Sequence, residues 1–230
     1  MPHRFDLDTA SQARAPGEYA VTLTDAWNIG PVPNGGYQVA AACRAALTEL
    51  GVADVLSVSS YFLGASAPGP ATLHVEVAKR GRATSLAQVR LVQEARERLR
   101  ALVLAGDLGE LRGPELHRRG PPELPPPEAC LRLDPDAPVS PRLMNEIELR
   151  LDPATAAFTR GERDPDAPLE LRAWARFTDG RPVDALALAL LSDVLPPTIF
   201  NALGITGWVP TLELTTQIRR RPAPGWIRLR

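Results

Sequence analysis

Residues 34–50 read NGGYQVAAACRAALTEL, and this stretch decides the fold. Asn34, Gly35 and Gly36 form a turn, and the alanine-rich run after them favours helix, so we predict a helix over Tyr37–Leu50. Small side chains occupy nearly every face of this helix. A helix of this kind fits the inside of a sheet that wraps around it.

Strand-like runs surround the helix in the sequence, and no second helix interrupts them. A strand is predicted over Tyr19–Leu23 before the helix. The four strands predicted after it are Leu56–Leu63, Ala71–Lys79, Ser85–Gln93 and Leu99–Ala105. One long helix followed by an antiparallel meander is typical of the α+β class.

The same order of elements occurs a second time. A helix is predicted over Val183–Leu195, and the strands Val209–Ile218 and Trp226–Arg230 follow it. When the two copies are aligned, Ser57–Leu63 falls on Leu212–Ile218. A repeat at this scale predicts two similar halves packed against each other, with functional sites where the halves meet.

A proline-rich segment separates the two copies. Its centre reads GPPELPPP over residues 120–127, a composition that favours an extended, semi-rigid chain. We therefore predict a first half over 1–106, a linker over 107–141 and a second half over 142–230. The second half has no match to the last two strands of the first, so we expect it to be incomplete at its C-terminal end. Truncation is the favoured explanation, ahead of a partner that completes the sheet, and an open sheet edge predicts a homo-oligomer.

Composition narrows the class of protein. The chain has 230 residues, 44% of them hydrophobic, which is enough to bury a substantial core. A net charge of −1 argues against nucleic-acid binding, and the basic cluster Arg219–Arg221 favours a solvated strand end. No apolar run approaches the roughly 20 residues of a membrane span, so no membrane insertion is expected, and no secretory signal is recognised. Cys43 and Cys130 lie far apart and fit a reducing, cytoplasmic setting.

Three groups of motifs follow one another along the chain. They are PNGGYQV at 33–39; SYFL at 60–63 with Pro-Gly at 68–69 and KRGRATS at 79–85; and LSD at 191–193 with PTLEL at 210–214. Together they resemble the acyl-CoA thioesterases of the TesB-like (thioesterase II) group. Each motif alone is weak, but their order and spacing make the match fairly specific. The resemblance implies a double hot-dog fold, in which two long helices are each wrapped by an antiparallel sheet.

The resemblance also implies an activity. Proteins of this group hydrolyse an acyl-CoA substrate to a free acid and CoA, and neither a metal nor an organic cofactor is implied. Their catalytic set is an Asp, a Thr and a Gln in the second hot dog. Asp193 matches the Asp and Thr211 matches the Thr. The Gln belongs to a last strand for which this chain has no match, and Gln217, on an earlier strand, does not replace it.

Asp193 is also conspicuous without the family. It follows a segment, Ala185–Ser192, that is apolar on every side and is therefore expected to be buried. The C-terminal end of a helix disfavours a negative charge, so we expect a raised pKa for the Asp193 carboxyl and a role as general base. A solvated helix end without function explains the residue equally well from the sequence alone.

Thr211 is less distinctive, because a threonine in a strand suits the pleat and is most often structural. Its interest comes from its position after Pro210, on the segment that returns after Asp193. There its hydroxyl is expected to help hold the attacking water.

Gly35, Gly36 and Tyr37 form the candidate substrate and oxyanion site. They begin a helix, where backbone N–H groups are free to bind an anion. A tight turn that needs positive φ explains the two glycines equally well. Asn34 is expected to cap the helix.

The three histidines, His3, His74 and His117, are scattered, and they form neither a metal motif nor a Ser-His-Asp arrangement. An acid that activates water is therefore the simplest hydrolytic option. Hot-dog hydratases need a catalytic histidine, which neither predicted helix start contains. The remaining alternative is a non-enzymatic acyl-CoA-binding or scaffold protein of the same fold.

Overall fold

The computed structural model describes residues 2–114, 116, 120–138, 140–166, 168–205 and 207–230, so that His117 lies outside the described residues. The α-helices in these ranges are α1 (Arg4–Asp8), α2 (Gly35–Leu50), α3 (Leu143–Glu146), α4 (Ala185–Leu191) and α5 (Phe200–Leu203). The strands are β1 (Gln12–Ala15), β2 (Glu18–Leu23), β3 (Asn28–Ile29), β4 (Val32–Pro33), β5 (Asp54–Phe62), β6 (Gly69–Lys79), β7 (Thr84–Gln93), β8 (Arg96–Gly106), β9 (Leu131–Arg132), β10 (Ile147–Leu151), β11 (Ala173–Phe177), β12 (Glu213–Gln217) and β13 (Ile227–Leu229).

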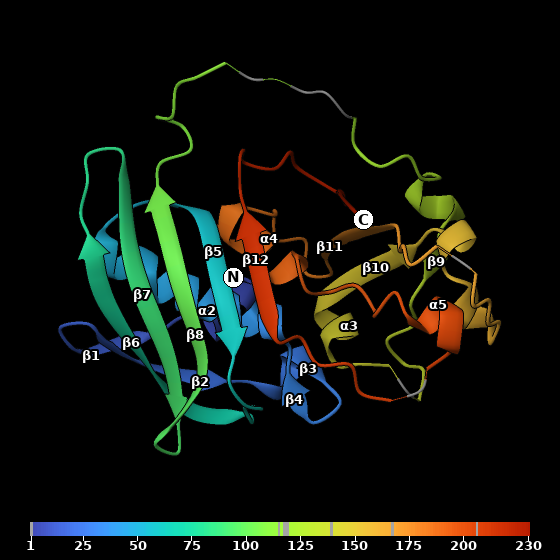
Figure 1. Cartoon of the computed structure of the whole chain (residues 1–230), viewed down its shortest axis with the longest axis horizontal. Helices are drawn as coiled ribbons and strands as arrows, with labels where there is room; N and C mark the ends of the chain where they lie inside the picture. Colours follow the sequence, from blue (N-terminus) through green and yellow to red (C-terminus); the bar gives the residue numbers. More distant parts are fainter. Residues whose placement is uncertain (1, 115, 117–119, 139, 167, 206) are drawn as a thin grey trace.

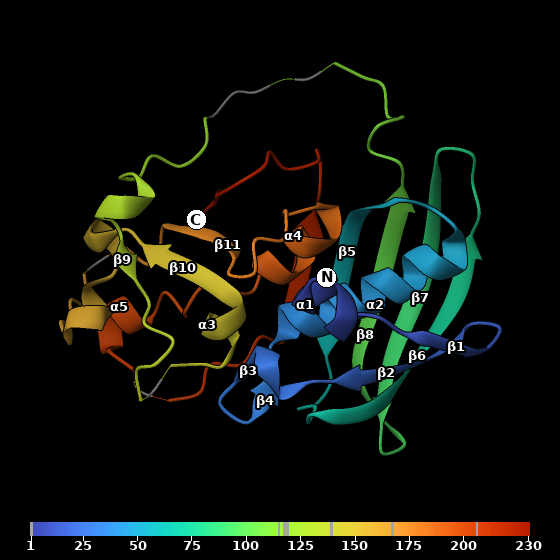
Figure 2. The same cartoon turned by 180° about the vertical axis from the view of Figure 1, so that it is seen from behind.

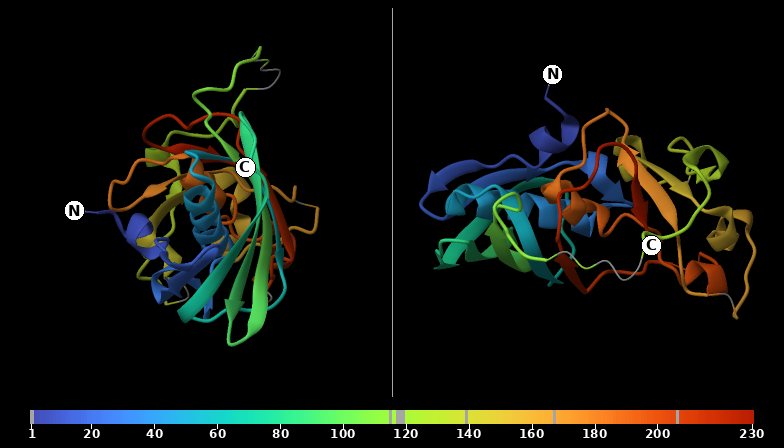
Figure 3. Two further views of the ribbon diagram at one scale, coloured as in Figure 1. Left: turned by 90° about the vertical axis from the view of Figure 1, so that its left-hand side faces the viewer. Right: turned by 90° about the horizontal axis from the view of Figure 1, so that it is seen from above.

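A large antiparallel sheet wraps around α2 (Figures 1 and 2). Its strands run in the order β1-β2-β6-β7-β8-β5-β12, and α2 packs against β2, β5, β6, β7 and β8. Figure 3 shows the helix inside the curve of the sheet. The alanines at 40–42 and 45–46 are fully buried, because small side chains let a helix lie close to a curved sheet. The helix predicted over Tyr37–Leu50 is confirmed, and it begins two residues earlier.

All five strands predicted in the first half are confirmed, with small changes at their ends. The largest change is the turn between β7 and β8, since the predicted strands Ser85–Gln93 and Leu99–Ala105 leave Glu94–Arg98 between them. The turn is tighter, because Glu94 and Ala95 adopt positive φ values of 53° and 58° and β8 resumes at Arg96. Neither residue is a type that favours positive φ, so no residue pattern pointed to a two-residue turn.

The two halves meet along one strand pair, β5 with β12 (Figure 1). The sequence match aligns Ser59 with Leu214 and Ser60 with Thr215. In the sheet Ser59 pairs with Thr215 and Ser60 with Leu214. Each residue thus lies opposite the counterpart of its neighbour, which places a local pseudo-twofold axis between these two pairs. The predicted relation between the two halves holds at this junction.

The second half forms a smaller sheet in the order β13-β11-β10-β9. β11 pairs with β13 in the antiparallel sense, as β2 pairs with β6 in the first half. In the described ranges, no strand of the second half corresponds to β7 or β8. The predicted helix Val183–Leu195 is real but shorter, because α4 ends at Leu191. Two prolines follow at 196 and 197, and a proline disfavours helix at the residue before it. α4 packs against α2 and β5.

The proline-rich segment lies against the second sheet. The backbone oxygen of Pro122 accepts a hydrogen bond from Arg228 at 3.4 Å, that of Pro125 accepts one from Trp174 Nε1 at 2.8 Å, and that of Pro127 accepts one from Arg150 at 3.0 Å. The three donors lie side by side in register on β13, β11 and β10. We call residues 122–127 the proline strap, and it crosses the strands instead of running along them.

The segment predicted as a linker, 107–141, also contains β9, which pairs with β10. Figure 1 shows β8 and β9 on opposite sides of the molecule. No helix in the described residues is long and apolar enough to cross a membrane.

Candidate active site

The N-terminal end of α2 and the C-terminal end of α4 touch at the pair of glycines. A Cβ atom on Gly36 would lie 2.4 Å from the backbone oxygen of Leu190, and one on Gly35 would lie 2.8 Å from Asp193 Oδ2. Both distances are shorter than side chains tolerate. Neither glycine has positive φ, and both belong to the helix. The turn explanation is therefore wrong, and close approach of the two helix ends is what requires glycine here.

The close approach brings Asp193 onto the start of α2. Its Oδ2 atom accepts hydrogen bonds from the Gly36 N–H at 3.0 Å and from Asn34 Nδ2 at 3.1 Å. Its Oδ1 atom accepts a hydrogen bond from the Thr211 hydroxyl at 3.1 Å. Residues from both halves of the chain thus converge on one carboxyl group, as the repeat predicts for a site where two halves meet.

The pKa of the Asp193 carboxyl is raised above its ordinary value. Burial is the largest cause, since it penalises the charged form, and hydrogen bonds from Gly36, Thr211, Asn34 and Gly35 act in the opposite direction. The N-terminal end of α2 also favours a negative charge. The carboxyl can therefore ionise although it is partly buried. The raised pKa agrees with the sequence-based expectation, and Asp193 is not a fully solvated helix end.

A cavity of about 830 Å³ opens beside this carboxyl group. Asp193, Thr211, Gly35 and Asn34 line it, together with many apolar side chains, among them Phe62, Leu143, Met144, Phe158, Phe200 and Trp208. No lysine, arginine or histidine lies among the described lining residues. The cavity therefore suits an uncharged, apolar group placed next to the carboxyl group of Asp193, and Asp134 is the other acid that lines it.

Tyr37 lies apart from this cavity. Its ring stacks on Trp27 at a centroid distance of 5.5 Å, and its hydroxyl donates to the backbone oxygen of Asp8 at 2.9 Å. Its N–H donates to Asn34 Oδ1 at 2.9 Å, which confirms Asn34 as the helix cap. Since its ring and both of its donor groups are used inside the protein, we leave Tyr37 out of the site.

Two family profiles match this sequence. Residues 23–106 match the profile of the acyl-CoA thioesterase N-terminal domain, and residues 127–230 match that of the acyl-CoA thioesterase C-terminal domain. An uncharacterized protein of Mycobacterium tuberculosis is 33% identical over 230 residues, a match that covers 90% of this chain and 77% of that protein. The chain belongs to the acyl-CoA thioesterase family.

Solved structures of other proteins share the fold. A candidate thioesterase II from Thermobifida fusca superposes with a TM-score of 0.87 at 31% identity, covering 99% of this chain and 85% of that one. A hot-dog protein of unknown function from Alicyclobacillus acidocaldarius gives a TM-score of 0.81 at 21% identity, covering 94% and 78%. The latter identity shows the fold alone. The fold of this acyl-CoA thioesterase family member is the double hot dog.

The site contacts of two polar residues were not predicted from the sequence. Asn34 was expected to cap α2, but its contact with Asp193 was not foreseen. Gln38 lies one turn further along α2, is buried and lines the cavity. Its Oε1 accepts from the Ser66 hydroxyl at 2.7 Å and its Nε2 donates to the backbone oxygen of Pro33 at 2.8 Å. A signal did exist, since Asn34 and Gln38 are four residues apart and share a helix face.

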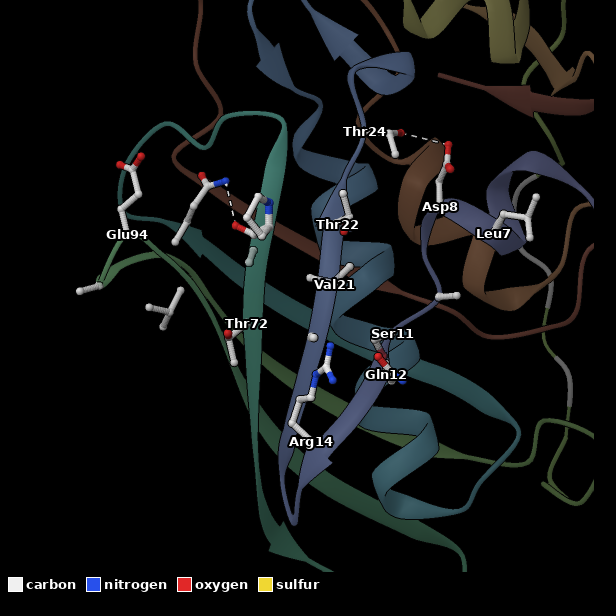
Figure 4. Close-up of a pocket in the computed structure, with 17 residues that line it drawn as sticks. Leu7, Asp8, Ser11, Gln12, Arg14, Val21, Thr22, Thr24, Thr72 and Glu94 are labelled. Atoms are coloured by element: carbon white, nitrogen blue, oxygen red, sulfur yellow. Dashed lines mark hydrogen bonds between the residues drawn. The ribbon is translucent and has the colours of Figure 1, made fainter.

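Other features of this family member lie away from the site. Gln217 is exposed on β12 and bonds to Arg219, so it does not take the place of the family's catalytic Gln. A second hollow, of about 740 Å³, lies between α1 and the strands β1, β2, β6 and β7 (Figure 4). Neither Asp193 nor Thr211 lines it. Within the described ranges, no group of His, Cys, Asp and Glu side chains is arranged to hold a metal ion.

Proposed function

We propose that this chain hydrolyses an acyl-CoA thioester to a free acid and CoA, with Asp193 as the general base. The observation that carries the proposal is the uneven use of its two carboxylate oxygens. Each carboxylate oxygen has two lone-pair positions. The measured hydrogen bonds reach Oδ2 from Asn34 and Gly36, whereas the one that reaches Oδ1 comes from Thr211. Oδ1 therefore keeps one position for a water molecule.

The Thr211 hydroxyl complements this position. Its hydrogen is donated to Asp193 Oδ1, so its lone pairs are available to accept a hydrogen bond. A water molecule that donates one hydrogen to Asp193 Oδ1 and the other to Thr211 Oγ1 keeps its own lone pair free. That lone pair is the nucleophile in the proposed reaction.

The proposed reaction has two steps, addition of water and loss of the thiolate. The water oxygen attacks the thioester carbonyl carbon while Asp193 takes a proton, which gives a tetrahedral oxyanion. The C–S bond then breaks, the electron pair leaves on sulfur, and the protonated Asp193 returns the proton to the CoA thiolate. General-base assistance of this kind typically contributes about 10²–10⁴-fold in rate.

The amides that we predicted for the oxyanion take a different role in this proposal. The Gly36 N–H already donates to Asp193, and the Tyr37 N–H already donates to Asn34. We therefore assign the start of α2 to holding the base. Gly35 keeps its predicted place beside the substrate, because it lines the cavity.

Thiol release from a panel of acyl-CoAs of increasing length tests the proposal. We expect turnover by the parent and a fall of about 10²–10⁴-fold in kcat/KM for Asp193→Asn. Thr211→Val removes the hydroxyl at nearly constant volume, and we expect a smaller loss, because the water keeps its bond to Asp193.

Calorimetry with a non-hydrolysable acyl-CoA analogue provides the control for binding. If the parent binds the analogue but releases no thiol from any substrate, the chain is the non-enzymatic acyl-CoA-binding protein. If Asp193→Asn hydrolyses every substrate as fast as the parent, Asp193 is not the base.

A further inference from the structure

Asn34 makes three hydrogen bonds with one small side chain, and it is 2% exposed. Its Oδ1 accepts from the Tyr37 N–H at 2.9 Å, which caps α2. Its Nδ2 donates to Asp193 twice, to the backbone oxygen at 2.8 Å and to Oδ2 at 3.1 Å. One amide group therefore joins α2 of the first half to the carboxyl group of the second half.

The cap fixes which way this amide faces. If the side chain were turned over, its NH₂ group would meet the Tyr37 N–H and its oxygen would meet the two oxygens of Asp193. All three contacts would then be repulsive. The helix cap thus guarantees that the donor end of Asn34 faces Asp193.

We propose that Asn34 is the positioning residue for the base, and that it decides which oxygen of Asp193 takes the proton. With the Gly36 N–H, it fills both lone-pair positions of Oδ2 and leaves Oδ1 beside Thr211 for the water. Its second bond, to the backbone oxygen of Asp193, stops the carboxyl group from moving away from α2. This inference rests on the proposed function for its catalytic meaning, but the contacts can be tested without substrate.

The expected signature is a change in the titration of Asp193. The hydrogen bond from Asn34 favours the charged form of the carboxyl group, so its removal raises the pKa further. The other groups that act on this carboxyl, Gly35, Gly36 and Thr211, are uncharged. Asp134 is the only other ionisable side chain among the described residues that line the cavity.

Asn34→Ser separates the two roles of the residue. Serine caps a helix about as well as asparagine, so α2 keeps its cap while both donors to Asp193 are lost. Asn34→Asp, of the same shape, keeps the cap and places a negative oxygen against Asp193. Asn201→Ser is the matched control. Asn201 is also buried, with 3% of its surface exposed, and it donates to the backbone oxygens of Thr155 and Glu170 but not to Asp193.

The experiment follows the ¹³C chemical shift of the Asp193 carboxyl carbon against pH in the parent and the three variants. We expect the midpoint to rise by about one pH unit in Asn34→Ser, the size expected for a lost hydrogen bond to a charged group. In Asn34→Asp we expect a larger rise. Its midpoint then describes the interacting carboxyl groups of residues 34 and 193 together. Asn201→Ser is expected to lower the melting temperature and leave the midpoint unchanged.

Activity gives the second readout. In the active protein, we expect the acid limb of the pH–rate profile of Asn34→Ser to shift together with the titration midpoint of Asp193. We expect kcat of this variant to fall on the order of 10-fold at neutral pH. If Asp193 titrates at the parent's pH in Asn34→Ser, or in Asn34→Asp where the serine variant does not fold, Asn34 is only a helix cap and the proposal fails. A parent without thioesterase activity overturns the proposed function but leaves the titration result standing.

Discussion

At the scale of single residues, Asp193 combines two opposite demands. A general base must be able to lose its proton near neutral pH, yet burial favours the protonated form. The donors at the start of α2 lower the pKa again without adding a charged partner. The carboxyl group proposed as the base is therefore held by neutral groups, and no ion pair with another described residue neutralises it.

This arrangement predicts how Asp193→Asn changes stability with pH. A carboxyl whose folded-state pKa is raised contributes stability below its unfolded pKa, about 3.9, and that contribution is lost as the pH rises through the folded value. At pH 7–8 the ionised Asp193 carboxyl therefore lowers the free energy of unfolding of the parent, and an uncharged asparagine does not. We expect Asp193→Asn to melt at or above the temperature of the parent at neutral pH, with the difference shrinking towards about pH 4.

Thermal melting of both proteins across this pH range measures the effect. Asp184→Asn serves as the control, since Asp184 caps α4 and is half exposed in a pair with Arg181. A melting temperature of Asp193→Asn well below the parent at pH 8 would contradict this explanation of the raised pKa.

Some of these site residues could be predicted from the sequence and others could not, for a physical reason. Asp193 was visible because an acid beside an apolar helix is unusual. The second role of Asn34 was hidden because its cap alone already explains an asparagine at that position. Contacts between residues 159 positions apart, such as Asn34 with Asp193, depend on how the halves pack, and no local pattern encodes them.

At the scale of elements, the contact between α2 and α4 sets the geometry of the site. The backbone oxygen of Leu190 lies only 2.4 Å from the position of a Cβ atom on residue 36, and backbone yields less easily than a flexible side chain. The two helix ends can lie this close only because Gly36 has no side chain.

We therefore expect Gly36→Ala to push the two helix ends apart. The overpacking should cost about 1–3 kcal/mol or more in the free energy of unfolding. It should also weaken the hydrogen bond from the residue 36 N–H to Asp193, and with it any thioesterase activity. Chemical denaturation measures the first effect and thiol release the second.

Gly113→Ala is the matched control, because a Cβ atom there meets nothing within 4 Å and the backbone φ is not positive. This variant should unfold like the parent. If Gly36→Ala were equally stable and its Asp193 titrated as in the parent, the close approach would not matter.

Elements were predicted best where composition and pattern agree. The helix over residues 37–50 and the strands around it follow directly from propensity and alternation. The early end of α4 and the tight turn at Glu94 and Ala95 were missed. The prolines at 196 and 197 disfavour helix at residue 195 without fixing where α4 ends, and neither Glu94 nor Ala95 is a type that favours positive φ.

At the scale of the whole molecule, the two halves are joined by more than the chain that connects them. β5 pairs with β12 and α2 packs on α4. The ring centroids of Phe5 in the first half and Phe177 in the second lie 5.2 Å apart. Asp6 also forms an ion pair with Arg181, which is 7% exposed. These contacts form one continuous core across both halves.

We expect the halves to remain together after the connection is cut. A specific protease site inserted at Gly113, where the chain is exposed, allows a single cut outside both sheets. The two fragments should elute as one species from a sizing column and should retain any thioesterase activity, because the site depends on packing between the halves. A denaturing gel confirms the cut, and separate elution without denaturant would show that the connection itself holds the site together.

The proline strap has a mechanical consequence. Its three carbonyl contacts, with Arg228, Trp174 and Arg150, are met one after another along the chain. A force that pulls the halves apart therefore loads them one at a time and peels the strap from the Pro122 end. Each residue released adds at most about 3.6 Å of slack. By contrast, the β5–β12 ladder resists a pull along its strands in shear, with its hydrogen bonds loaded together. The strap is thus the compliant part of the molecule and the shared strand pair is the stiff one.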